Sequence, residues 1–142
     1  MLALPALALA DFTRLEPLPA PRVVTAAEDY PGGGHKVEHL VDGNPRTEYS
    51  SSSLGTGTFV EFDFGAPVKL AGLRHVDRND PATVASSELV CFDEAGRETG
   101  RVTIAHANEK AGVTFHTWPE PMSARRARWQ VTKLGPQNFG TV

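Results

Sequence analysis

Short runs that alternate apolar and polar residues dominate the chain. In the segment TFVEFDF, residues 58–64, three apolar side chains alternate with the acidic residues Glu61 and Asp63. Residues 124–132 (ARRARWQVT) alternate again, with arginine and glutamine opposite alanine, tryptophan and valine. A period of two places successive side chains on opposite faces of a strand. Both segments are therefore predicted to be antiparallel strands with one buried face and one solvated face, the acidic pair lying on the solvated side.

Turn residues separate further β-rich runs at short intervals. Residues 87–92 and 100–105 are joined by Asp-Glu-Ala-Gly-Arg, a composition typical of a hairpin loop. More strands are predicted at 22–27, 68–76 and 113–118. A Gly-Ala-Pro turn before the second of these and two prolines after the third are expected to end strands. Since no segment of about twelve residues or more has helical periodicity, the pattern predicts an all-β sandwich.

Composition narrows the class of protein further. The chain has 142 residues, with 14 basic and 17 acidic side chains and a net charge of −3, which suits one globular domain. This mildly acidic balance lacks the basic patch that nucleic-acid binding requires. The single cysteine, Cys91, excludes an intramolecular disulfide and any multi-cysteine metal site. Its strand spacing from Leu89 predicts a small buried side chain.

The N-terminal segment has the features of an export signal. Residues 2–10 (LALPALALA) are uninterrupted apolar residues that end in a small-x-small site, and the run is too short to span a bilayer. The alternative is a short buried segment. Residues 1–10 are therefore expected to be a signal peptide, truncated at its basic start, of a secreted or cell-surface protein. Residues 11–21 contain three prolines and are expected to form an extended lead-in to a domain at 22–142.

One turn collects oxygen donors of several kinds. In the segment LVDGNPRTEYSS, residues 40–51, Asp42, Asn44 and Thr47 alternate with a glycine and a proline. Carboxylate, amide, hydroxyl and carbonyl oxygens are the ligands that Ca²⁺ prefers. The alternative is an ordinary Asx turn, in which Asp42 binds its own backbone.

Four segments in order resemble successive landmarks of discoidin, or coagulation factor 5/8 type C, domains and of related galactose-binding-like carbohydrate-binding modules. They are LVDGNPRTEYSSS, TFVEFDFGAPVKLAGLRHV, SSELVCFDEAGRE and ARRARWQVTKL. The resemblance covers residues 22–134. It implies a jelly-roll β-sandwich of about eight antiparallel strands. It does not by itself imply a ligand, because one fold hosts many functions.

The resemblance also implies a structural calcium ion. In the carbohydrate-binding members the turn with the Asp-Gly pair holds this ion, which places it at Asp42, Asn44 and Thr47. The family completes the site with a glutamate in a final strand near the C-terminus, and no such glutamate follows here. The domain is therefore expected to lack its last strand.

Candidate ligand contacts follow from the same resemblance. Arg78 occupies the place of the family's sugar-binding arginine, and Asn79 and Asp80 follow it in the same loop. Phe139, in a late loop, corresponds to the aromatic platform. Ser51 lies in the stretch where the family has a sugar-contacting histidine. The alternatives are a solvated Arg78 paired with a neighbouring aspartate, and a Phe139 that packs under a loop.

These features favour a non-catalytic carbohydrate-binding module of an exported protein. The expected partner is a glycan or cell-surface polysaccharide, with no nucleic acid and no membrane contact. Two alternatives stay open: a discoidin-type adhesion module for proteins or membrane surfaces, and an accessory fragment of a larger glycan-active enzyme. The chain contains no G-x-S-x-G or P-loop motif. Its one pair of histidines at i and i+4 lacks the glutamate of a zinc protease.

Overall fold

The computed structural model describes residues 14–138 and is almost entirely β-structure. The strands are β1 (Arg22–Ala26), β2 (Phe59–Val76), β3 (Val84–Phe92), β4 (Glu98–Ala105) and β5 (Val113–Leu134), with two short 3₁₀ helices, η2 (Val37–Leu40) and η3 (Gly55–Gly57). The all-β prediction is confirmed, as is the hairpin between β3 and β4. The expected signal peptide at 1–10 and the candidate platform Phe139 lie outside the described residues.

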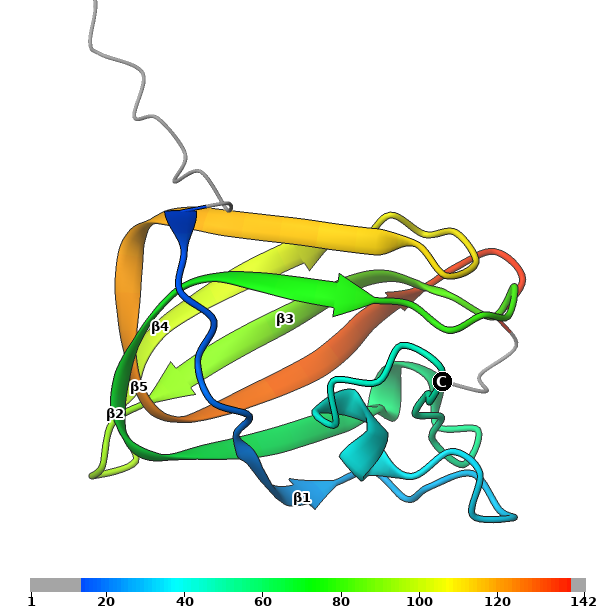
Figure 1. Cartoon of the computed structure of the whole chain (residues 1–142), viewed down its shortest axis with the longest axis horizontal. Helices are drawn as coiled ribbons and strands as arrows, with labels where there is room; N and C mark the ends of the chain where they lie inside the picture. Colours follow the sequence, from blue (N-terminus) through cyan, green and yellow to red (C-terminus); the bar gives the residue numbers. More distant parts are fainter. Residues whose placement is uncertain (1–13, 139–142) are drawn as a thin grey trace, which may run out of the picture.

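Two long strands bend to build both layers of the sandwich. All pairs are antiparallel, in the order β1-β2-β5-β3-β4. The start of β2 pairs with the end of β5, with Phe59 opposite Gln130, and the end of β2 pairs with the start of β5, with Val76 opposite Val113. Figure 1 shows β2 and β5 curling over together at one edge of the molecule. One layer therefore holds β1, β3, β4 and half of each long strand, and the other halves form the second layer.

The predicted strand ends at this corner are wrong. Gly65 has a φ of 80°, and the ladder between β2 and β5 is interrupted from Asp63 to Val68, so the chain bends there without ending the strand. Pro119 and Pro121 lie within β5 at the matching corner. A proline is tolerated where the ladder is interrupted, because no N–H is needed there. Within residues 14–138 the jelly-roll sandwich has five strands instead of about eight. Two pairs of the seven segments predicted as strands, 58–64 with 68–76 and 113–118 with 124–132, are each one continuous strand.

The core lies between the two layers. Ala127, Trp129 and Val131 are buried, as their alternation predicts, and Cys91 is fully buried. Burial raises the pKa of the Cys91 thiol to about 11, which keeps it protonated. The indole N–H of Trp118, at the corner of β5, donates a hydrogen bond of 2.7 Å to the carbonyl of Leu70. This hydrogen bond joins β5 to β2 at the corner, where the ladder between them is irregular.

Asp63 departs from the predicted solvated position. Its side chain is only 7% exposed and forms ion pairs with Arg22 and Arg125. It also accepts a hydrogen bond from the backbone N–H of Gly65. The carboxylate is buried next to the interruption of the ladder, where two guanidinium groups balance its charge. Within residues 14–138 no helix is long and apolar enough to cross a membrane.

Candidate functional site

A cleft of about 450 Å³ lies at one end of the sandwich, where the loops after the strands meet. One wall is the turn at 42–49, and the other is the end of β2 with the loop that follows it. In Figure 1 this end lies opposite the β3–β4 hairpin. The side chains that give the cleft its chemistry are His39, Asp42, Asn44, Thr47, Glu48, His75, Arg78, Asn79 and Trp129.

Glu48 and Arg78 join the two walls of the cleft. Oε1 of Glu48 accepts hydrogen bonds from Nε and Nη2 of Arg78 at 3.3 and 3.2 Å. Its Oε2 accepts from the backbone N–H of Asn79 at 3.1 Å. The Arg78 side chain is 14% exposed and that of Glu48 is 26% exposed. A charged pair at this depth holds the guanidinium in one orientation, so Arg78 is positioned in advance of any ligand.

Asp77 shapes the loop that carries Arg78. Its Oδ1 accepts from the backbone N–H of Arg78, and its Oδ2 accepts from that of Val84. Burial raises the pKa of Asp77, while these two N–H groups act in the opposite direction. The backbone N–H of Asp77 in turn donates to the carbonyl of Gly112. The loop is thus tied to β3 on one side and to the turn before β5 on the other.

The structure brings only some of the predicted ligand contacts together. Arg78 and Asn79 both line the cleft. Asp80 does not, since its Oδ1 accepts from the backbone N–H of Ala82 in a local turn. Ser51 is fully buried, and its hydroxyl lies 2.7 Å from that of Thr58. The loop folds the side chain of Ser51 inward, and Ser51 is not among the residues that line the cleft.

The predicted metal turn has a compact arrangement of oxygen atoms. Oδ2 of Asp42 accepts from the Thr47 hydroxyl at 2.6 Å, and the same hydroxyl lies 2.9 Å from the carbonyl oxygen of Asn44. Oδ1 of Asp42 accepts from the N–H of Asn44. The Thr47 hydroxyl and this N–H lower the pKa of Asp42. Three oxygens of different types thus converge, which fits a hard cation. Within residues 14–138 no group of three or more His, Cys, Asp and Glu side chains could hold a metal ion.

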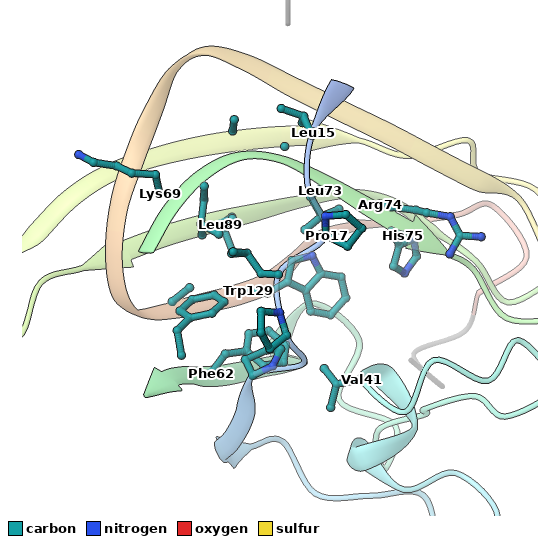
Figure 2. Close-up of a pocket in the computed structure, with 18 of the residues that line it drawn as sticks. Leu15, Pro17, Val41, Phe62, Lys69, Leu73, Arg74, His75, Leu89 and Trp129 are labelled. Carbon is teal, nitrogen blue, oxygen red and sulfur yellow. The ribbon is translucent and has the colours of Figure 1, made fainter. Parts of the chain in front are cut away.

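A second hollow, of about 570 Å³, lies between the layers and is mainly apolar. Figure 2 shows Leu15 and Pro17 of the lead-in on one side of it, with Leu73, Leu89 and Trp129 of the sheet lying around it. Residues 14–21 contain no strand, and Figure 1 shows this segment crossing the open side of the sandwich. The hollow shares His75 and Trp129 with the cleft. Its polar lining residues are Glu16, Lys69, Arg74 and His75, among a majority of apolar ones.

The sequence analysis missed Glu48, His75 and Trp129 as parts of the cleft. Glu48 stands inside the quoted motif, between Thr47 and Tyr49, and its acidic side chain beside a buried aromatic was the available signal. Trp129 was expected only as a core residue. Its position at the junction of the core and the cleft depends on the fold and leaves no signal in the local sequence.

Solved structures with the same fold include several carbohydrate-binding modules. The family 32 carbohydrate-binding module of C. perfringens NanJ, solved with galactose, matches with a TM-score of 0.63 and 16% identity, over 80% of this chain and 83% of that chain. Chitosan-binding module 2 from a chitosanase/glucanase of Paenibacillus sp. IK-5, solved with chitotriose, matches with a TM-score of 0.64 and 15% identity, over 87% and 91%. The family 32 module of AlyQ, solved with 4,5-unsaturated mannuronic acid, matches with a TM-score of 0.57 and 19% identity, over 84% and 89%.

These likenesses define the fold as a galactose-binding-like jelly-roll β-sandwich. No family model and no curated protein matches the sequence.

Proposed function

We propose that the protein is a non-catalytic carbohydrate-binding module that holds a glycan in the cleft between the 42–49 turn and the loop after β2. The observation that carries the proposal is Arg78, which lines this cleft and is fixed by Glu48. Sugar hydroxyls need planar polar groups in set positions, and a rigid sheet with end loops provides them. The cleft volume lies within the range of ordinary small-molecule sites.

The proposed role is binding and not catalysis. The structural neighbours that support it are binding modules, and those from Paenibacillus sp. IK-5 derive from a chitosanase/glucanase. The chain also matches 24% of the SpGH29 chain, with a TM-score of 0.60 and 16% identity. We therefore propose that such a module serves as an accessory domain that holds a larger glycan-active protein to its polysaccharide.

A glycan array tests the proposed function. We expect the protein to bind one class of glycans and Arg78→Ala to lower the affinity about tenfold or more, because charge-assisted hydrogen bonds are lost. Arg97→Ala is the matched control, since Arg97 lies in the hairpin at the other end of the sandwich and pairs only locally with Asp93. Phe139→Ala tests the proposed platform in the same assay. An array without hits, or hits that ignore Arg78→Ala, would refute the site.

We further propose that Ca²⁺ binds at the 42–47 turn. The support is that Asp42 Oδ2 and the Asn44 carbonyl oxygen both lie within hydrogen-bond distance of Thr47 Oγ1. When bound, the ion would supply charge that replaces these internal hydrogen bonds and holds the turn closed. The turn forms one wall of the cleft, so the ion would affect ligand binding by fixing the shape of that wall.

A further inference from the structure

Four side chains form a continuous hydrogen-bonded chain from the core to the cleft. Nε1 of Trp129 lies 2.8 Å from Oγ of Ser87, which lies 2.7 Å from Nε2 of His106. Nδ1 of His106 in turn lies 3.1 Å from Nδ1 of His75. Ser87, His106 and Trp129 are buried, and the rings of His75 and Trp129 are stacked at 5.9 Å. We call these four residues the relay, and both of its end members, Trp129 and His75, line the cleft.

Only one direction of hydrogen bonding satisfies every member of the relay. An indole N–H can only donate, so the Ser87 hydroxyl accepts from Trp129. Ser87 is fully buried, and among residues 14–138 Nε2 of His106 is the one acceptor within reach of its proton. A neutral imidazole that accepts at Nε2 carries its proton on Nδ1, so His106 donates to Nδ1 of His75. His75 must then carry its own proton on Nε2.

We propose that the relay fixes His75 as a neutral Nε2–H donor in the cleft and that this donor binds an acceptor oxygen of the glycan. The inference rests on the proposed function, since it adds one contact to the same cleft. Within residues 14–138, Nε2 of His75 has no hydrogen-bond partner, and it is not among the buried polar atoms that lack one. His75 therefore has an unused donor on an accessible atom, and its side chain lines the same cleft as Arg78.

Protonation of either ring breaks the relay. A second proton on His106 occupies Nε2 and removes the acceptor of the Ser87 hydroxyl, and one on His75 sets two Nδ1–H groups against each other. Burial lowers the pKa of both rings to about 4. Of the groups that face the pair, Asp77 after β2 raises the pKa of His106, and His116 on β5 lowers it. The relay is therefore expected to persist through neutral pH and to break as the pH approaches 4.

Nitrogen NMR of the imidazole rings tests the relay directly. In the full chain at pH 7, long-range ¹H–¹⁵N correlations distinguish a proton on Nδ1 from one on Nε2. We expect the Nδ1–H tautomer for His106 and the Nε2–H tautomer for His75. A proton on Nδ1 of His75, or a mixture of tautomers on either ring, would overturn the proposal. The measurement uses the unmodified protein, so no variant has to fold.

Two serine variants test whether the relay positions the donor. Ser87→Ala removes the group that orders His106, and we expect mixed tautomers and an affinity for galactose or chitotriose lowered about threefold to tenfold. Ser86→Ala is the matched control, because its hydroxyl bonds Thr132 outside the relay. We expect this control to leave both readouts unchanged. Equal effects of the two variants on affinity would contradict a positioning role for Ser87.

The sugar contact has a separate readout from the proposed function. On binding of galactose or chitotriose, the ¹⁵N resonance of Nε2 of His75 should shift. Sugar binding that leaves this resonance unmoved would overturn the contact while sparing the proposed function. If neither sugar binds, two proposals are refuted: that His75 contacts these sugars, and that the cleft binds galactose or chitotriose. The tautomer measurement still decides the relay in that case.

Discussion

At the scale of single residues, Glu48 determines how the cleft is arranged. It receives Arg78 on one carboxylate oxygen and the backbone of Asn79 on the other, across thirty residues of sequence. Both partners lie in the loop that the resemblance assigns to the ligand. A single carboxylate thus sets the position of the charged donor and the path of its loop.

The variant Glu48→Gln is expected to weaken ligand binding more than it weakens the fold. The neutral amide keeps one acceptor but loses the charge that orders Arg78, so the affinity for glycan should fall about tenfold and the free energy of unfolding by about 1 kcal/mol. Titration calorimetry and urea unfolding measure the two effects. Glu61→Gln is the control, because Glu61 pairs with Arg128 at 2.7 Å outside the cleft. Loss of affinity in Glu61→Gln but not in Glu48→Gln would contradict the role of Glu48 in ordering Arg78.

The His75 and His106 pair is expected to make stability depend on pH. Folding lowers the pKa of each ring from 6.5 to about 4, so between these values the unfolded chain binds more protons. The free energy of unfolding should therefore fall as the pH decreases from 6.5 to 4, by about 3 kcal/mol for one ring. Above pH 6.5 the pair should add no slope.

Urea unfolding at several pH values checks this sign. His75→Phe keeps an aromatic ring beside Trp129 and removes one titrating group, so its slope between pH 6.5 and 5 should be smaller than that of the wild type. The comparison is limited to this range because carboxylates add their own pH dependence below it. Backbone and arginine contacts lower the pKa values of Asp93 and Glu98, so protonation of these side chains at lower pH destabilises the protein. Identical slopes in the two proteins would contradict a stabilising neutral pair.

At the scale of elements, the bends of β2 and β5 decide the architecture. Gly65 has its positive φ at the bend of β2, and a Cβ there would meet no atom within 4 Å. Any cost of a side chain at this position must therefore come from the backbone conformation and not from crowding.

Gly65→Ala is expected to lower the free energy of unfolding by about 1 kcal/mol, or the melting temperature by about 3 °C. Gly34→Ala is a matched control, because Gly34 is also exposed and open around its Cβ but has no positive φ. The control should leave the melting temperature unchanged or slightly raised. Thermal unfolding followed by circular dichroism compares the two. Equal effects would show that the bend does not depend on the φ of Gly65.

The same elements show what local sequence can predict. Alternation located the strands and identified buried side chains such as Trp129, because a period of two directly reflects the pleat of a strand. It could not show that β2 continues past Gly65 or β5 past Pro119, because glycine and proline indicate a bend and a strand end equally well. Ser51 looked available beside the motif, but the fold of its loop buries it.

The candidate site was predictable only where a contact is local. Arg78 and Asn79 follow a strand directly, so their place in an end loop could be expected from the sequence. The pairing of Arg78 with Glu48 depends on two segments that meet only in the folded chain. The relay through His106 likewise joins residues from β2, β3, β5 and the end of β4. Such contacts have no characteristic spacing in the sequence that a motif could describe.

At the scale of the whole molecule, the sheet holds three loops against one another at one end. The turn at 42–49, the loop after β2 and the turn before β5 all contribute to the cleft. A ligand that binds only the folded chain stabilises all of it, because the free energy of binding adds to that of folding. Calcium at the 42–47 turn would therefore be visible as a change in the melting temperature of the entire domain.

Calcium is expected to raise the melting temperature, and excess chelator to lower it. At a concentration of about one hundred times the dissociation constant, the ion would add about 2.7 kcal/mol to the free energy of unfolding. Asp42→Asn removes the only carboxylate among the three proposed ligands and should abolish the dependence on calcium. Asp80→Asn serves as the control, because Asp80 accepts only a local backbone N–H in its loop and lies outside the metal turn. Scanning calorimetry of the three proteins, each with calcium and with chelator, separates the cases. A wild-type melting temperature that chelator leaves unchanged would refute the calcium site. The proposal of a glycan cleft would then rest on Arg78 and Glu48 alone.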